Sequence, residues 1–182
     1  SMPWQIGFIN IERPGRGVTV SAMGINGAQL SQWSKWRPGM WEDLAQTKAD
    51  LIILAYGTNE AFSGNLDISS TERTWRNYIR QIKNTLPNAG ILILGAPESL
   101  KTAYGSCGNR PVLLSEIQQM QQRVARDEKI MFWSWQDAMG GACSMKNWMA
   151  QGLAAKDGVH FSAQGYETAA DKLADSLIRF AQ

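Results

Sequence analysis

The 182-residue sequence has little of several features that would assign a function at once. It contains one histidine, two cysteines, and 18 basic against 16 acidic residues, for a formal net charge of +2. No Lys/Arg cluster stands out, so charge gives little reason to expect nucleic acid or an anionic membrane as a partner. No apolar run approaches the roughly 20 residues that cross a bilayer. With 44% apolar and 19% charged residues, the composition is that of an ordinary globular domain.

The first residues also lack a basic flank followed by a hydrophobic stretch, so we expect no signal peptide among them. Ser1-Met2 resembles the remnant of a tag. We therefore predict a lead-in over residues 1–16, in which Ile6–Glu12 could be a strand and residues 13–17 a turn. Residues 17–182 are predicted to form one domain.

Short apolar runs alternate with helical patterns along the chain. Helices are predicted near residues 30–46, 70–85 and 113–127, and a last one follows its capping residue Ser162. The runs that predict strands are Val18–Ser21, Leu51–Tyr56, Ile91–Gly95 and Ile130–Trp135. The second and third are almost continuously apolar, which is typical of parallel strands buried on both faces. The alternation predicts an α/β fold, a three-layer α/β/α sandwich with a flavodoxin-like, mostly parallel sheet.

Polar peptides, most of them with glycine, follow the predicted strands. They are Gly24–Gly27, Gly57–Glu60, Ala96–Ser99 and the loop before Asp157. In such a sheet, ligands bind where the loops leave the carboxyl ends of the strands. We therefore expect the chemistry at this edge.

The single histidine, His160, is the only candidate for an imidazole base. Asp157 stands three residues before it on a tight loop and could accept its Nδ1 proton, which would leave Nε2 facing a serine hydroxyl. The same spacing also suits a surface aspartate and a capping or core histidine. The pair alone leaves both interpretations open.

Two further positions could stabilise a developing oxyanion. The Asn59 amide comes just after the most hydrophobic predicted strand, where Gly57 would allow close backbone approach. Asn59 could equally be an asparagine in a left-handed, strand-ending turn. Gly27 could present its backbone N–H to the same oxyanion, although by itself it indicates only a turn.

The order and spacing of these blocks together resemble the SGNH (GDSL-like) hydrolases. The resemblance implies that Gly27 and Asn59 are oxyanion-hole donors, that His160 is the base and that Asp157 orients it. It implies no metal or organic cofactor. The stretch from Trp133 to His160 is most similar to bacterial peptidoglycan or carbohydrate O-acetylesterases.

One block of the family is missing. Its Gly-Asp-Ser, which supplies the nucleophile from the first strand, occurs nowhere in this sequence. Ser21 lies within a predicted strand rather than on a strand-to-helix elbow, so it is a poor substitute. Some relatives carry an accessory β-sandwich between the two first blocks, and we expect this chain to begin just after such an insertion. Ile6–Glu12 would then be the last strand of that module or would replace the missing first strand.

Without its first strand, the fragment should be inactive and should expose apolar strand edges. A homodimer, or complementation by the missing N-terminal segment, would cover these edges.

Cys107 and Cys143 both lie in glycine-rich segments that follow predicted strands. A disulfide between them would fit a periplasmic or secreted protein, whereas two unpaired thiols are the alternative. No CxxC spacing indicates a metal. Trp148, in the loop before Asp157, is a candidate for contact with a sugar ring, while the other tryptophans that we considered are expected to pack in the core.

Our first hypothesis is an extracytoplasmic esterase domain that removes acyl groups, with acetyl expected, from a carbohydrate or peptidoglycan. The main alternative is a non-catalytic binding or interaction domain on the same fold. A flavodoxin-like nucleotide binder is disfavoured because the sequence has no glycine-rich phosphate loop.

Overall fold

The computed structural model describes Gly15 and residues 17–180. Within these residues the chain forms three strands and eight helical segments. In chain order they are η1 (Leu30–Lys35), α1 (Met40–Gln46), β1 (Leu51–Leu54), α2 (Thr58–Phe62), α3 (Ile68–Thr85), β2 (Gly90–Leu94), α4 (Leu114–Asp127), β3 (Met131–Trp133), α5 (Trp135–Met139), α6 (Met145–Ala150) and α7 (Ala163–Phe180).

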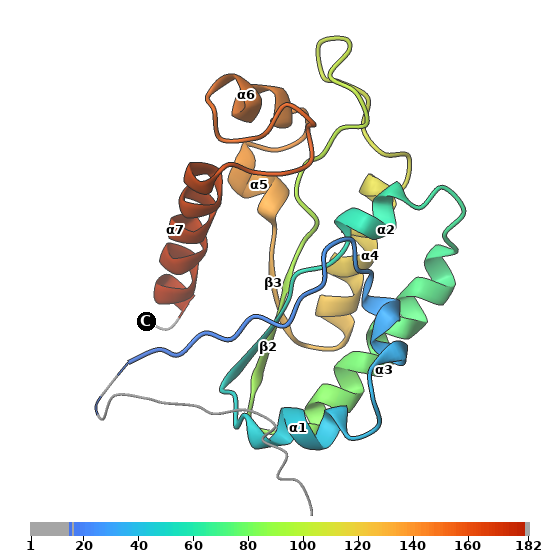
Figure 1. Cartoon of the computed structure of the whole chain (residues 1–182), viewed down its shortest axis with the longest axis vertical. Coiled ribbons are helices and arrows are strands. Elements are labelled where there is room, and N and C mark those ends of the chain that lie inside the picture. Colours follow the sequence, from blue (N-terminus) through green and yellow to red (C-terminus); the bar gives the residue numbers. More distant parts are fainter. Residues whose placement is uncertain (1–14, 16, 181–182) are drawn as a thin grey trace, which may run out of the picture.

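The strands form one parallel sheet in the order β1-β2-β3 (Figure 1). Leu51 of β1 is aligned with Gly90 of β2, and Leu92 of β2 with Met131 of β3. Helices occupy each connection, as parallel strands require. In Figure 1 the strands run between α7 on one side and α3 with α4 on the other. This confirms the predicted α/β sandwich with its parallel sheet.

β2 is the most buried strand because it has a neighbour on each side. Its residues Ile91, Leu92 and Ile93 are all buried, which accounts for the continuous apolar run. The helices α3 and α4 close over one face of the sheet with apolar residues spaced three or four apart. These residues are Trp75, Ile79 and Ile82 on α3, and Ile117, Met120 and Val124 on α4.

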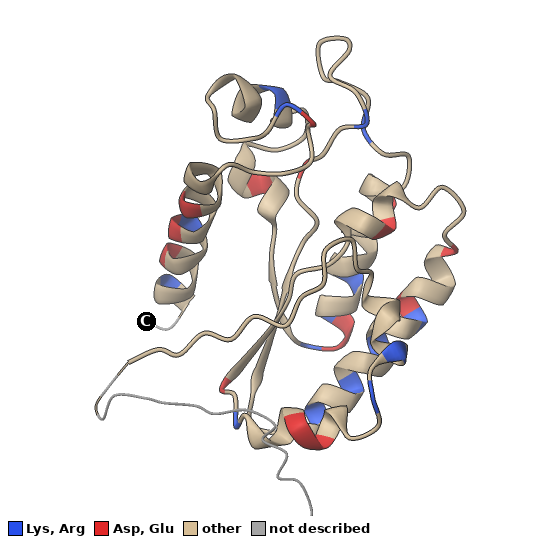
Figure 2. Cartoon of the chain, viewed as in Figure 1, with Lys and Arg blue, Asp and Glu red and all other residues tan. Residues whose placement is uncertain are grey.

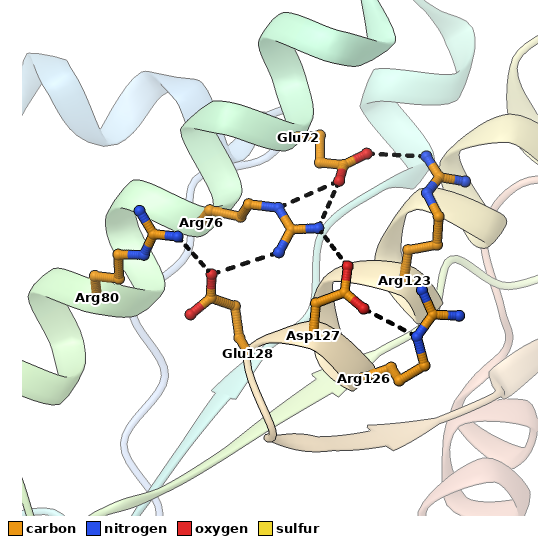
Figure 3. Close-up of polar contacts among 7 residues, drawn as sticks. All are labelled: Glu72, Arg76, Arg80, Arg123, Arg126, Asp127 and Glu128. Carbon is orange, nitrogen blue, oxygen red and sulfur yellow. Dashed lines mark hydrogen bonds and ion pairs between the residues drawn. The ribbon is translucent and has the colours of Figure 1, made fainter.

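A network of charged residues joins α3 to the end of α4 (Figure 3). At its centre, the Arg76 guanidinium lies 2.6 Å from Glu72 and 2.9 Å from Asp127, and Glu128 follows at 3.5 Å. Hydrogen bonds from Arg76 are the main cause that lowers the pKa of both Glu72 and Asp127. Asp127 and Glu128 come just before β3 begins, so the network lies toward the amino ends of the strands. We interpret it as structural.

Two sequence predictions for the first part of the chain were wrong. Val18–Ser21 forms no strand, and its Val18 and Val20 side chains are 92% and 85% exposed. No strand among residues 17–180 pairs with this segment, so its backbone groups find no ladder. The helix expected near residues 30–46 is instead two helices, η1 and α1. Pro38 disfavours a helical conformation at the residue before it, and Gly39 has a φ of +93°, so the helix is interrupted there.

The later elements agree with the sequence within a few residues. The predicted cap of the last helix is confirmed, since the Ser162 hydroxyl accepts the N–H of Gly165 at 3.1 Å. The strand expected at Ile6–Glu12 lies outside the described residues, and the boundary between residues 1–16 and 17–182 stays a prediction. None of the helices described between residues 17 and 180 is long and apolar enough to span a membrane. Figure 2 shows acidic and basic residues intermingled along the helices.

Candidate active site

The turn after β1 is held by a buried carboxylate. Glu60, near the start of α2, accepts the backbone N–H groups of Gly57 and Leu30, each at 2.9 Å. Burial raises the pKa of Glu60, and these backbone bonds partly oppose that effect. One side chain therefore fastens the turn to the segment that begins η1.

Gly57 is required at this turn by both its conformation and its surroundings. Its φ is +121°, and a Cβ there would lie 2.7 Å from Nε2 of Gln121 and 2.9 Å from the Cβ of Ala96. Gln121, buried on α4, donates to the Tyr56 carbonyl at 2.7 Å and accepts the Ala96 N–H at 2.8 Å. The ends of β1 and β2 are thus joined around the glycine, which sets the direction in which the chain continues toward Asn59.

The structure brings Asn59 and the Gly27 turn together. The Asn59 amide donates to the carbonyl of Ala28 at 2.9 Å. Gly27 has a φ of +77°, in a turn closed by a bond from the Ala28 N–H to the Ile25 carbonyl at 3.0 Å. A side-chain amide carries two N–H groups, and this is the one hydrogen bond that the Asn59 side chain donates to the described residues.

Asp157 and His160 form a closed loop just before α7. Oδ2 of Asp157 lies 2.7 Å from Nδ1 of His160, while Oδ1 accepts the backbone N–H groups of Val159 and His160 at 2.8 and 3.0 Å. Hydrogen bonds from His160 lower the pKa of Asp157 to about 2, the bond from the backbone N–H contributing most and the bond from the ring next. A charged carboxylate at Nδ1 favours the tautomer with the proton on that nitrogen. Nε2 is then left as the basic nitrogen.

This pair of residues faces solvent. The side chains of His160 and Asp157 are 73% and 50% exposed. Among residues 17–180, no serine hydroxyl is hydrogen-bonded to the His160 ring.

The Asp157–His160 loop is attached to a second hydrophobic cluster rather than to the sheet. Ala154 and Phe161 form an antiparallel bridge across the loop, and the Ala155 N–H donates to the His160 carbonyl at 2.8 Å. The Phe161 side chain is buried and stacks on Trp135, with ring centroids 5.3 Å apart. The base of the loop is thus clamped while its tip stays exposed.

The two halves of the site lie at the same end of the sheet. Figure 1 shows α2 and the chain between α6 and α7 beyond the ends of the strands where the chain leaves the sheet. A base oriented by a carboxylate, together with N–H donors, suits acyl transfer. No group of three or more His, Cys, Asp or Glu side chains that could hold a metal occurs in the part of the chain that the structure describes.

Two other expectations have clear outcomes. Cys107 and Cys143 form a disulfide, with Cα atoms 4.8 Å apart. Trp148 was expected to contact a sugar ring, but the structure buries it, with 4% of the residue exposed. Its indole N–H donates to the Met139 carbonyl, and its ring meets Phe161 edge to face. It is therefore a core residue here rather than an exposed platform for a sugar.

Sequence reasoning assigned no role to three buried polar residues, Glu60, Glu98 and Gln121. A glutamate three residues after the glycine that precedes a helix fits a capping pattern, and this signal could have found Glu60. No comparable signal marks Gln121, whose partners lie 25 and 65 residues away.

Comparisons with known proteins agree with this geometry. Residues 10–168 match the model of the GDSL-like Lipase/Acylhydrolase family. The chain is 68% identical to a peptidoglycan O-acetylesterase of known structure, with a TM-score of 0.87 over 88% of this chain. The match covers 46% of that protein, so the chain spans about half of its length.

More distant structures share the fold. The acetyl xylan esterase AlAXEase is 16% identical with a TM-score of 0.66, over 85% of this chain and 78% of that one. Est24, a carbohydrate acetylesterase from Sinorhizobium meliloti, is 17% identical with a TM-score of 0.59, over 78% of this chain and 66% of that one. A search of curated proteins gives no match.

Proposed function

Because this chain belongs to the GDSL-like lipase/acylhydrolase family, we propose that it forms the histidine–aspartate half of a serine esterase site. The substrate class is an acetylated carbohydrate, with peptidoglycan first because of the 68% identical relative. The observation that carries the proposal is the 2.7 Å contact between Asp157 Oδ2 and Nδ1 of the only histidine.

In the proposed reaction, a serine hydroxyl attacks the ester carbonyl and Nε2 of His160 takes its proton. The charged Asp157 stabilises the imidazolium that forms. The Gly27 N–H and the second side-chain N–H of Asn59 hold the oxyanion of the tetrahedral intermediate. His160 then returns the proton to the leaving sugar oxygen, and a second cycle with water releases acetate.

We assign the nucleophile to a segment outside this sequence, because no Gly-Asp-Ser occurs in it. The edge of the sheet supports this assignment. β1 has only one neighbour among the described strands, and its Ile53 is 43% exposed. An added strand at β1 would cover this side chain. Its other edge could pair with Val18–Ser21, whose backbone groups would then form strand hydrogen bonds.

An extracytoplasmic location fits the proposal. Peptidoglycan lies outside the cytoplasm, and the disulfide between Cys107 and Cys143 belongs to an oxidising compartment.

Two assays test the proposal. The first compares p-nitrophenyl acetate hydrolysis by this chain and by His160→Ala, with a fluorophosphonate probe for activated serines. We expect no difference in rate and no labelled serine. Hydrolysis that depends on His160, with a label on Ser21 or another serine of the chain, would contradict the external nucleophile.

The second assay uses a chimera in which residues 17–182 of this chain replace the matched part of the 68% identical relative. We expect ester hydrolysis that falls on the order of 10³- to 10⁴-fold in Asp157→Asn, because the orienting charge is lost. A folded but inactive chimera would favour the non-catalytic binding domain.

A further inference from the structure

Glu98 is the most completely buried acidic residue near the proposed site. It lies in the loop after β2 and its exposed fraction is 0%. Its Oε2 accepts the side-chain N–H of Gln136, on α5, at 2.5 Å. Its Oε1 lies 2.6 Å from Nε of Arg110, an ion pair that is close but not aligned as a hydrogen bond. A buried charge has to be compensated, so this carboxylate needs both partners.

Through these partners Glu98 joins three segments that are distant in sequence. Arg110 comes just before α4 and also reaches the Ser115 hydroxyl at 3.1 Å. The residues between Glu98 and Arg110 form a loop whose base is closed by backbone hydrogen bonds between residues 101–102 and Asn109. The disulfide between Cys107 and Cys143 links the same loop to the connection between α5 and α6. The whole unit is therefore restrained at several points.

The segment that Glu98 anchors touches the Asp157–His160 loop two residues later. The Leu100 N–H donates to the carbonyl of Gly158 at 2.8 Å. Gly158 has a φ of +70°, and a Cβ there would lie 3.0 Å from the Cβ of Leu100. Leu100 itself is buried. The peptide between Asp157 and His160 is thus supported directly by the segment that Glu98 holds.

From this geometry we propose that Glu98 is a positioning residue for the Asp157–His160 pair. It does not touch the pair. With Arg110 and Gln136 it fixes the backbone at Leu100, and Leu100 fixes Gly158 so that Asp157 Oδ2 faces Nδ1 of His160. Its catalytic meaning rests on the proposed function, whereas the effect on the ring geometry does not.

Because the chain has one histidine, ¹⁵N NMR of the ring reports this geometry without assignment ambiguity. In the neutral ring of the unaltered chain we expect the proton on Nδ1, held by Asp157. Asp157→Asn gives the reference for loss of this tautomer. In Glu98→Gln, which keeps the side-chain volume and removes the charge, we expect the Nδ1–H fraction to fall toward that reference.

A matched control separates positioning from loss of stability. Glu60→Gln changes a nearly as buried carboxyl group that does not contact the Asp157–His160 loop, and it should leave the tautomer unchanged. If Glu98→Gln does not fold, the double change Glu98→Gln with Arg110→Met leaves no charge unpaired and takes its place. A folded Glu98 variant with the tautomer of the unaltered chain would overturn the proposal, as would an equal change in Glu60→Gln.

This readout is independent of ester hydrolysis. An inactive chimera with an intact Glu98 effect would reject the esterase function alone. An active chimera with no Glu98 effect would reject the positioning role alone.

Discussion

The start of α2, which carries Asn59, and the Asp157–His160 loop lie at the same end of the sheet but are held in different ways. The first follows a core strand and is fixed by two buried side chains, Glu60 and Gln121. The second follows no strand, and its support comes from another loop at Leu100 and from the cluster around Phe161. The half of the site that follows the sheet is thus fixed by the core. The other half depends on contacts between loops and on the disulfide between Cys107 and Cys143.

The largest expected effect comes from that covalent link. The two cysteines are separated by 36 residues in sequence. Replacing both by serine removes this cross-link from the unfolded chain, and the gain in chain entropy there should lower the free energy of unfolding by about 4 kcal/mol. Urea unfolding measures this loss. If the two halves are held independently, the amide signals of residues 57–60 should stay unchanged in the folded variant, and a shift there would show that the halves are coupled.

Gly57→Ala should break the sheet-built half. The new Cβ would meet Gln121 and Ala96 at less than 3.0 Å, in a backbone conformation that alanine rarely adopts. Overpacking and strain together should cost about 3 kcal/mol in the free energy of unfolding. Gly64→Ala is the control, because nothing lies within 4 Å of its Cβ position. Equal stabilities of the two variants would contradict a tight fit at Gly57.

Gly158→Ala should have a smaller effect on the loop-built half. The φ of +70° and the contact with Leu100 at 3.0 Å should cost about 2 kcal/mol, since a loop can shift more easily than a strand end. Gly152→Ala shares the left-handed conformation, with a φ of +72°, but has open space around its Cβ position. The difference between the two unfolding midpoints isolates the Leu100 contact, and no difference would argue against it.

The smallest effect concerns pH. The pKa of Asp157 is lowered from 3.8 to about 2 in the folded chain. The stability that this carboxylate contributes is therefore present above about pH 4 and is lost as the pH falls toward 2. Because Asp157 is half exposed, solvent screening should keep the contribution below about 1 kcal/mol. Stability curves of the unaltered chain and of Asp157→Asn should converge over this window, and parallel curves would contradict the assignment.

Much of the fold could be predicted because it depends on local patterns. The continuous apolar run at residues 91–94 is a buried central strand, and the spacing of Trp75, Ile79 and Ile82 is one face of a helix. Val18–Ser21 could not be predicted correctly in the same way. Its alternating pattern is that of a strand, but a strand also needs a partner, and none of the described strands pairs with it.

The site shows the same division. The sequence by itself determined which residues can act as base and orienter, since there is one histidine with an aspartate three residues before it. Only the tertiary structure decided that Trp148 is buried, that Asn59 reaches Ala28, and that Glu98 supports Gly158 through Leu100. The physical reason is that spacing along the chain specifies short-range hydrogen bonds, whereas burial and contacts between distant segments arise from how the layers pack.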